Sequence, residues 1–335
     1  MTIIVDSHIP NIQGLIEPYA QVEYLEPGDI TPDAVKDADA LIVRTRTRCD
    51  ANLLDGSRVR FIGSATIGTD HIDLDYCAAH GITVRNAPGC NAPAVAQWVF
   101  CAIAAWMDAC NITSADGLTL GIVGVGHIGS IVARWARQLG FDVLLNDPPR
   151  EDKEGSAVVT FSPLDELQRR CDIITFHTPL TRDGAWPTWH LCDQAFLDGL
   201  THCRLLIDAA RGAIVDNAAL LGWHGDVALD CWENEPHISR DLLDKAIVAT
   251  PHIAGYSREG KQRGTAMMLE ALNAFYGWDI PIPEIAAPAI GAEDVTLAGI
   301  AASYDILADT AALKSSPATF ESQRNHYPHR PEYLG

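Results

Sequence analysis

An arginine, a glutamate and a histidine each stand just behind a short hydrophobic run in the second half of the chain. They are Arg211, Glu235 and His252. Because residues that follow parallel strands line the crevice at the carboxyl edge of a sheet, we expect these side chains to lie close together. A guanidinium can hold a carboxylate through two hydrogen bonds, an imidazole can accept a hydroxyl proton, and a carboxylate can orient the imidazole. Together they could oxidise a 2-hydroxy acid, although each alone also fits a surface pair, a turn acid or a capping histidine.

A glycine-rich hexapeptide supplies a second chemical signal. The segment Gly124-Val125-Gly126-His127-Ile128-Gly129 directly follows an apolar run and opens a segment with a helical pattern. The first glycine permits a tight turn, the second lets the backbone approach a pyrophosphate, and the third lets helix and strand pack closely. Alone, such a hexapeptide also fits a plain strand–turn–helix corner.

Asp147 strengthens the dinucleotide interpretation. It ends the next hydrophobic run, 18 residues after Gly129, where a carboxylate can accept hydrogen bonds from ribose hydroxyls. The same carboxylate would repel a 2′-phosphate. The alternative is a turn residue before Pro148 and Pro149. The two features together predict that the chain binds NAD in preference to NADP.

A small basic cluster near residue 45 is a candidate site for an anionic substrate. Arg44, Arg46 and Arg48 alternate along one loop, and this alternation also fits a solvated loop, above all for Arg46 and Arg48. Arg44 stands next to Thr45, whose hydroxyl could add a donor. We therefore expect Arg44 to be the member of the cluster that contacts the substrate.

Short apolar runs alternate with helical segments along most of the chain. The first series lies at residues 2–5, 22–25, 40–43, 59–62 and 82–84, and the second at 118–123, 141–145, 171–176, 204–208, 227–230 and 246–249. Continuously apolar strands of this kind are typical of parallel sheets covered on both faces. The expected fold is α/β, with two doubly wound parallel-sheet lobes: a Rossmann cofactor lobe and a flavodoxin-like substrate lobe.

Composition narrows the classes of partner. The 335 residues include 24 Lys+Arg and 44 Asp+Glu, a formal net charge of −20, which disfavours binding to nucleic acid or to an anionic membrane surface. Gln97 and Asp108 interrupt the longest apolar stretch, which disfavours a membrane-spanning helix. No basic region precedes the first apolar run, which disfavours a signal peptide. Nine cysteines without a C-x-x-C spacing suggest thiols in a reducing compartment and no metal site. We therefore expect a cytoplasmic protein.

These residues resemble the NAD-dependent D-2-hydroxyacid dehydrogenase family. The likeness is carried by residues 124–129, 210–216, 230–236 and 251–255. It implies that Arg211 binds the substrate, that His252 is the acid/base and that Glu235 supports it. It also implies a cofactor-binding set in which Asp230 holds the nicotinamide carboxamide. The set is Gly124, Gly126, His127, Ile128, Gly129, Asp147, Thr178, Ala209, Asp230 and Gly255.

A closer resemblance is to the branch of this family that oxidises 4-phospho-D-erythronate during pyridoxal 5′-phosphate synthesis in bacteria. Residues 61–71, 86–92, 147–150, 176–180 and 252–257 carry it. It implies substrate contacts from Thr45, Thr66 and Tyr256, and a homodimer formed partly through the C-terminal region. Thr45 replaces the serine usual in that branch, which keeps the hydroxyl, and the C-terminal region is shorter than usual.

The expected organisation has the chain crossing twice between lobes. The substrate domain comprises residues 1–93 and 254–280, and the NAD-binding domain comprises residues 94–253. A C-terminal dimerisation region spans 281–335 and starts with a linker rich in Pro and Ala. Two alternatives remain open: a dehydrogenase for another 2-hydroxy acid such as phosphoglycerate or glycerate, and an NAD-sensing regulatory protein.

Overall fold

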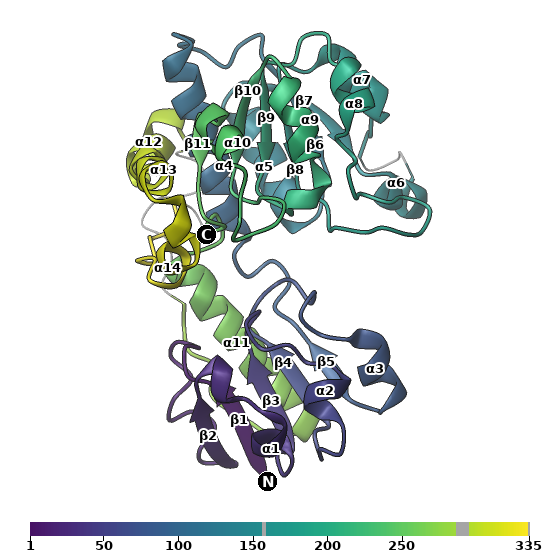
Figure 1. Ribbon diagram of the computed structural model, residues 1–335, viewed down its shortest axis with the longest axis vertical. Helices are drawn as coiled ribbons and strands as arrows, with labels where there is room; N and C mark the ends of the chain where they lie inside the picture. Colours follow the sequence, from purple (N-terminus) through teal and green to yellow (C-terminus); the bar gives the residue numbers. More distant parts are fainter. Residues whose placement is uncertain (156–158, 286–294, 334–335) are drawn as a thin grey trace. The chain divides into compact units, whose positions relative to one another are not determined.

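The computed structural model describes residues 1–155, 159–285 and 295–333, which form two compact units (Figure 1). Unit 1 comprises Met1–Asn91 with Ser257–Ala287, and unit 2 comprises Ala92–Tyr256 with Pro288–Gly335. That the domains expected from the sequence fold separately stays a prediction. Residues 286–288 of the expected linker lie outside the described residues.

A five-stranded parallel sheet forms the centre of unit 1. Its strands are β1 (Thr2–Asp6), β2 (Gln21–Leu25), β3 (Ala40–Val43), β4 (Phe61–Ser64) and β5 (Thr83–Arg85). They pair in the order β2-β1-β3-β4-β5, and each pair is parallel. The direction of winding reverses between β1 and β3, as it does in flavodoxin-like sheets, so that helices cover both faces.

Alternate side chains of these strands enter two separate hydrophobic layers. Ile3 and Phe61 pack in the layer formed with helix α11 (Arg258–Tyr276), which lies along the sheet in Figure 1. Ile4 and Ile62 pack in the opposite layer. That layer is covered by α1 (Pro32–Val35), α2 (Ala51–Leu54) and α3 (Leu74–Ala79), and a 3₁₀ turn, η1 (Pro27–Asp29), precedes α1. Burial on both faces explains why the strands are apolar without alternation.

A six-stranded parallel sheet forms the centre of unit 2. Its strands are β6 (Thr119–Val123), β7 (Asp142–Asn146), β8 (Ile173–Phe176), β9 (Leu205–Asp208), β10 (Asp226–Leu229) and β11 (Val248–Ala249). The order is β11-β10-β9-β8-β6-β7, with all pairs parallel. The winding reverses between β6 and β8, and ligands of such sheets bind at this switch point. The predicted fold class is confirmed, with strand ends shifted by one or two residues.

Helices cover both faces of this second sheet. One face packs on α4 (Ala92–Ala109) and α5 (His127–Gln138). The other face packs on α7 (Leu164–Arg170), α8 (Gln194–Asp198), α9 (Asn217–Gly222) and α10 (Arg240–Lys245). Two short pieces, α6 (Pro148–Glu154) and the 3₁₀ turn η2 (Gly212–Ile214), follow β7 and β9. Trp98, Trp106 and Trp135 are buried on α4 and α5 and belong to the core of unit 2.

Helix α4 has the length and composition of a membrane-spanning helix, with 18 residues and a mean hydropathy of 1.2. Length and composition alone therefore do not exclude a membrane span, although Gln97 and Asp108 interrupt the stretch. The helix is 78% buried within the structure, where it packs against α5 and α12 (Leu297–Ser303). Its apolar character therefore fits a core helix of unit 2.

The C-terminal segment packs on unit 2 rather than forming a compact unit of its own. After α12 come α13 (Ile306–Ser315), a 3₁₀ turn η3 (Pro317–Thr319) and α14 (Phe320–Asn325), drawn in yellow in Figure 1. The Thr310 hydroxyl accepts a hydrogen bond from the N–H of Ala249 at 3.1 Å, so this backbone group of the edge strand β11 has a partner. The buried Arg330 donates to the carbonyls of Ile253 and Tyr256 at 3.1 and 3.3 Å. These bonds tie the end of the chain to the segment that follows β11.

Candidate active site

The glycine-rich turn between β6 and α5 leaves room for a ligand on one side only. Gly124 has a φ of +88°, and a Cβ there would collide with the backbone of His177 and Thr178. A Cβ at Gly129 would collide with the carbonyl of Gly124, because helix and turn are in contact. At Gly126 a Cβ would meet nothing within 4 Å. The open side therefore lies at the N-terminus of α5, where backbone N–H groups attract phosphate.

Asp147 is tied to this turn. Its Oδ2 accepts the N–H of Val125 at 2.8 Å, and its Oδ1 accepts the N–H of Arg150 at 3.1 Å, which caps α6. A carboxylate has about four acceptor sites, so these two bonds leave capacity for a ribose hydroxyl. The Arg150 guanidinium is paired with Glu154 at 2.8 Å, a contact that the sequence analysis did not anticipate.

The other residues of the expected cofactor set surround the same edge. His127 and Ile128 open α5, Thr178 follows β8 and Ala209 follows β9. The Thr178 Oγ1 is buried and has no hydrogen-bond partner among the described residues. A buried hydroxyl without a partner is costly unless a ligand satisfies it, so this position fits a bound cofactor with polar groups.

Asp208 ends β9 and shapes the turn that leads to Arg211. Its Oδ1 accepts the N–H of Ala210 at 2.8 Å, and its Oδ2 is buried without a partner in the described ranges. Burial raises the pKa of Asp208 to about 8, although the backbone N–H groups of Ala210 and Arg211 favour the charged form. Burial therefore favours the protonated form of this carboxyl group. In the sequence, Asp208 stands out only as the end of a hydrophobic run.

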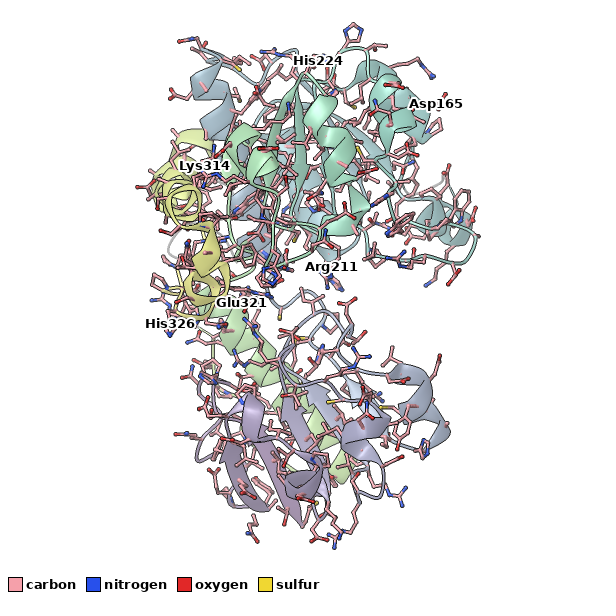
Figure 2. The ribbon with its side chains drawn as sticks, in the orientation of Figure 1. Asp165, Arg211, His224, Lys314, Glu321 and His326 are labelled. Carbon is pink, nitrogen blue, oxygen red and sulfur yellow. The ribbon has the colours of Figure 1, made fainter. Side chains whose placement is uncertain are left out.

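Arg211 follows this turn and is partly exposed. Its Nη1 donates to the carbonyl of Ala210 at 2.7 Å. Figure 2 shows Arg211 at the opposite end of unit 2 from His224, which precedes β10. Arg211 thus lies at the carboxyl edge of the sheet, as the sequence predicts.

Asp230 fixes the backbone around His252. It is 1% exposed, and its Oδ1 accepts the Thr250 hydroxyl at 2.5 Å and the N–H of Ile253 at 2.7 Å. Its Oδ2 accepts the N–H of Ala254 at 2.9 Å. Burial raises the pKa of Asp230, although the charge of His252 and these donors lower it. Spare acceptor capacity for a nicotinamide carboxamide remains mainly on Oδ2.

Glu235 and His252 form a hydrogen-bonded pair. His252 Nδ1 lies 2.8 Å from Glu235 Oε2, and the two side chains are 27% and 18% exposed. The N–H of Trp232 donates to Glu235 Oε1 at 2.9 Å. Burial raises the pKa of Glu235, but the hydrogen bond and charge of His252, the Trp232 N–H and Arg324 outweigh it, so the pKa is lowered. The pair can orient an imidazole and stabilise its protonated form.

His252 also has an unusual backbone. Its φ is +58°, a left-handed conformation that a non-glycine residue adopts only when its surroundings hold it. Its own N–H donates to the carbonyl of Asp230 at 2.8 Å. Strained residues of this kind gather at functional sites.

The expected substrate residues of unit 1 follow β3 and β4. The Arg44 guanidinium makes two hydrogen bonds, at 3.0 and 3.2 Å, to the buried carboxylate of Asp6. Thr45 is exposed beside it, and the Thr66 hydroxyl lies 2.8 Å from that of Ser64. The sequence predicts that Arg44 contacts the substrate, and the structure adds that its guanidinium pairs with a carboxylate on the neighbouring strand β1.

Tyr256 and Gly255 end the segment that follows His252 in unit 2. The Tyr256 hydroxyl accepts a hydrogen bond from the Nε of Arg324 at 3.3 Å. Arg324 comes from α14, and its Nη1 lies 3.9 Å from Glu235 Oε2. Sequence reasoning missed this arginine because it belongs to no motif.

Comparison with known proteins gives one consistent answer. Residues 93–254 match the model of the D-isomer specific 2-hydroxyacid dehydrogenase, NAD binding domain. An erythronate-4-phosphate dehydrogenase of Bacteroides thetaiotaomicron is 44% identical, over 99% of this chain and 97% of that protein. The enzyme of the same name from Porphyromonas gingivalis is 41% identical, over 98% and 93%. The chain belongs to the D-isomer-specific 2-hydroxyacid dehydrogenase family.

Solved structures agree with this assignment. The TT0316 protein of Thermus thermophilus aligns with a TM-score of 0.70 and 26% identity, covering 84% of this chain and 99% of that one. The D-lactate dehydrogenase of Aquifex aeolicus, solved with NAD and lactic acid, aligns with a TM-score of 0.67 and 25% identity, over 83% and 96%. The chain is an NAD-dependent oxidoreductase, which confirms the predicted family and cofactor.

The preference for NAD over NADP is tested at Asp147. We expect Asp147→Asn to narrow the ratio of NAD to NADP affinity by about tenfold or more, since it removes the negative charge but keeps an oxygen that can accept the N–H of Arg150. Fluorescence titration of both cofactors would measure the ratio. Asp165→Asn is the matched control, because this exposed carboxylate pairs with Arg169 on α7. Equal NAD and NADP affinities in the parent protein would contradict the assignment of Asp147.

Proposed function

We propose that the chain oxidises 4-phospho-D-erythronate at C2 to 2-oxo-3-hydroxy-4-phosphobutanoate, with NAD as oxidant, in the synthesis of pyridoxal 5′-phosphate. The observation that carries the reaction class is the 2.8 Å contact between His252 and Glu235, in the unit that holds the glycine-rich turn. The substrate is supported by the name of full-length relatives that are 41–44% identical.

His252 is the proposed proton acceptor. Because Nδ1 faces the Glu235 carboxylate, the neutral ring carries its proton on Nδ1 and leaves Nε2 able to accept the C2 hydroxyl proton. The C2–H bond breaks with both its electrons while the C2=O bond forms. NAD, when bound, supplies the hydride acceptor. Glu235 then stabilises the imidazolium that has formed.

Arg211 is the proposed anchor of the substrate carboxylate. A guanidinium carries five donors in a planar fork, so its bond to the Ala210 carbonyl is compatible with a two-bond grip on a carboxylate. Holding the carboxylate at this edge would present C2 to His252. Tyr256 could add a hydroxyl contact from the same unit.

Arg44, Thr45 and Thr66 are the proposed contacts for the phosphorylated end. They follow adjacent strands of unit 1, so their side chains leave the sheet at one edge. Asp6 compensates the charge of Arg44. Recognition would therefore depend on directed donors more than on net positive charge.

The acid–base assignment predicts a loss of turnover without a loss of cofactor. We expect His252→Gln to lower kcat by about 10² to 10⁴-fold, because general acid–base catalysis contributes about that much, while NAD affinity stays near that of the parent. Stopped-flow kinetics and NAD titration would separate the two quantities. His190→Gln is the control, since that histidine contacts Glu233 rather than Glu235. Near-normal turnover in His252→Gln would refute the assignment.

The substrate assignment predicts strong selection for the phosphate. We expect kcat/KM for D-erythronate or D-lactate to be lower by about 10² or more, because each unmade charged hydrogen bond costs about 1.5 to 3 kcal/mol. A panel that includes 3-phosphoglycerate and D-glycerate would identify any other preferred acid. Equal rates with D-lactate and 4-phospho-D-erythronate would overturn the substrate, and no turnover of any acid would favour an NAD sensor.

Variants of Arg44 sharpen the same experiment. Arg44→Gln would leave Asp6 buried without its partner, so Asp6→Asn combined with Arg44→Gln is the cleaner change. We expect the double variant to shrink the gap between phosphorylated and unphosphorylated acids. Arg48→Gln is the control, because this guanidinium is exposed and pairs with Asp50 in the same loop.

We also propose that the protein works in the cytoplasm as a homodimer that uses residues after about 285. The support is the resemblance to a dimeric family branch and the predominance of two-fold symmetry among soluble oligomers. Light scattering at micromolar concentration should give twice the chain mass, and a chain truncated after residue 294 should show weaker association. A monomer at that concentration would reject the dimer.

A further inference from the structure

The C-terminal helix α14 brings a positive charge to the Glu235–His252 pair. The Arg324 side chain is only 15% exposed, and its Nη1 lies 3.9 Å from Glu235 Oε2. The same oxygen receives His252 Nδ1 at 2.8 Å. The Nε of Arg324 also donates to the Tyr256 hydroxyl at 3.3 Å. One guanidinium thus contacts two residues of the candidate site.

We propose that Arg324 is a positioning residue of the dehydrogenase: it shares Glu235 Oε2 with His252 and holds the Tyr256 hydroxyl in place. The C-terminal segment would then set the ionisation of the acid–base pair from outside every motif of the family. For its role in turnover this inference rests on the proposed function.

Neighbouring contacts hold Arg324 where it is. Phe320, in the first turn of α14, is 1% exposed and packs in the core of unit 2. Gln323 donates to the carbonyl of Ser316 at 3.1 Å and to the Thr319 hydroxyl at 2.8 Å, so the helix is tied to the preceding turn. Figure 2 shows Glu321, from the same helix, toward the end of unit 2 where Arg211 lies. Arg324 therefore belongs to a helix whose position is fixed by packing and hydrogen bonds.

Arg330 fastens the other side of the same region. Its guanidinium donates to the carbonyls of Ile253 and Tyr256, and it stacks over the Tyr304 ring at 4.3 Å. The segment from His252 to Tyr256 is consequently bound to the chain terminus at its backbone. Arg324, by contrast, contacts the side chain of Tyr256 in this segment.

The charges around the pair decide the direction of the effect. Besides Glu235, the ionisable groups near His252 include Asp230, which interacts with its charge, and Cys231, whose Sγ lies within 4.8 Å of a carboxylate oxygen of Glu235 and a ring nitrogen of His252. Arg324 on α14 reaches the pair through Glu235. Glu321 lies 3.8 Å from the Arg324 guanidinium and compensates it in part. A carboxylate that is shared with a guanidinium stabilises an imidazolium less than an unshared one. Arg324 should therefore favour the neutral ring that accepts a hydroxyl proton.

The decisive measurement is the titration of the His252 ring in Arg324→Gln. We expect its midpoint to move to higher pH by about one unit, because a positive charge near the pair has been removed. NMR of ring-labelled histidine in the NAD-bound enzyme, with the signal assigned by its loss in His252→Gln, gives the midpoint without any substrate. The acidic limb of the pH–kcat/KM profile should move by the same amount.

Two further variants separate charge from hydrogen bonding. Arg324→Lys should bring the His252 midpoint most of the way back to that of the parent, since it keeps the charge. It should still raise KM, because an ammonium cannot contact Tyr256 and Glu235 through one planar fork. Arg240→Gln is the matched control. Arg240 also touches the C-terminal segment, through the carbonyl of Lys314, but its ion pair is with Asp244. It should change neither the midpoint nor KM.

The possible outcomes are distinct. An unchanged His252 midpoint in a folded Arg324→Gln protein overturns the proposal, as does a shift of equal size in Arg240→Gln. If Arg324→Gln fails to fold, Arg324→Lys decides: a midpoint and a KM both equal to those of the parent would overturn the role of the planar fork. Absence of turnover with every phosphorylated acid would refute the proposed substrate, while the NMR midpoint would still decide the role of Arg324.

Discussion

The buried carboxylate of Asp230 is the constraint on which the segment around His252 depends. It directly follows β10 and accepts hydrogen bonds from the Thr250 hydroxyl and from the N–H groups of Ile253 and Ala254. These donors flank His252, whose left-handed backbone could not persist without such support. A single side chain thus converts the end of an edge strand into a rigid support for an imidazole.

Asp230 lies at the edge of the sheet where the groups for the cofactor and the substrate come together. Parallel strands end together, so the turns after β6, β8, β9, β10 and β11 occupy one edge of the sheet. At that edge the glycine turn offers backbone donors, while Glu235 and His252 offer a proton-transfer pair. A parallel sheet therefore brings together groups that lie far apart in the sequence, and contacts such as the one between Glu235 and His252 then fix them in place.

Sequence reasoning succeeded where structure follows from local pattern. Apolar runs marked the strands, and the strand–turn–helix pattern placed the glycine turn. Arg211, Glu235 and His252 each come after a strand of unit 2, as the sequence predicts. It could not find Arg324, because the docking of the C-terminal segment depends on long-range contacts such as the one between Thr310 and Ala249. It also could not show that Arg44 pairs with Asp6, since that contact requires the adjacency of β1 and β3.

Paired cations explain how an acidic chain can serve an anionic substrate. With a net charge of −20 the molecule offers no general attraction to phosphate or carboxylate. Arg44, the proposed phosphate contact, is held by Asp6, so its guanidinium has a carboxylate that fixes its orientation. Pairing lowers the local charge but preserves the planar array of donors. Selection among hydroxy acids would then follow from donor geometry, which salt screens far less than it screens attraction at long range.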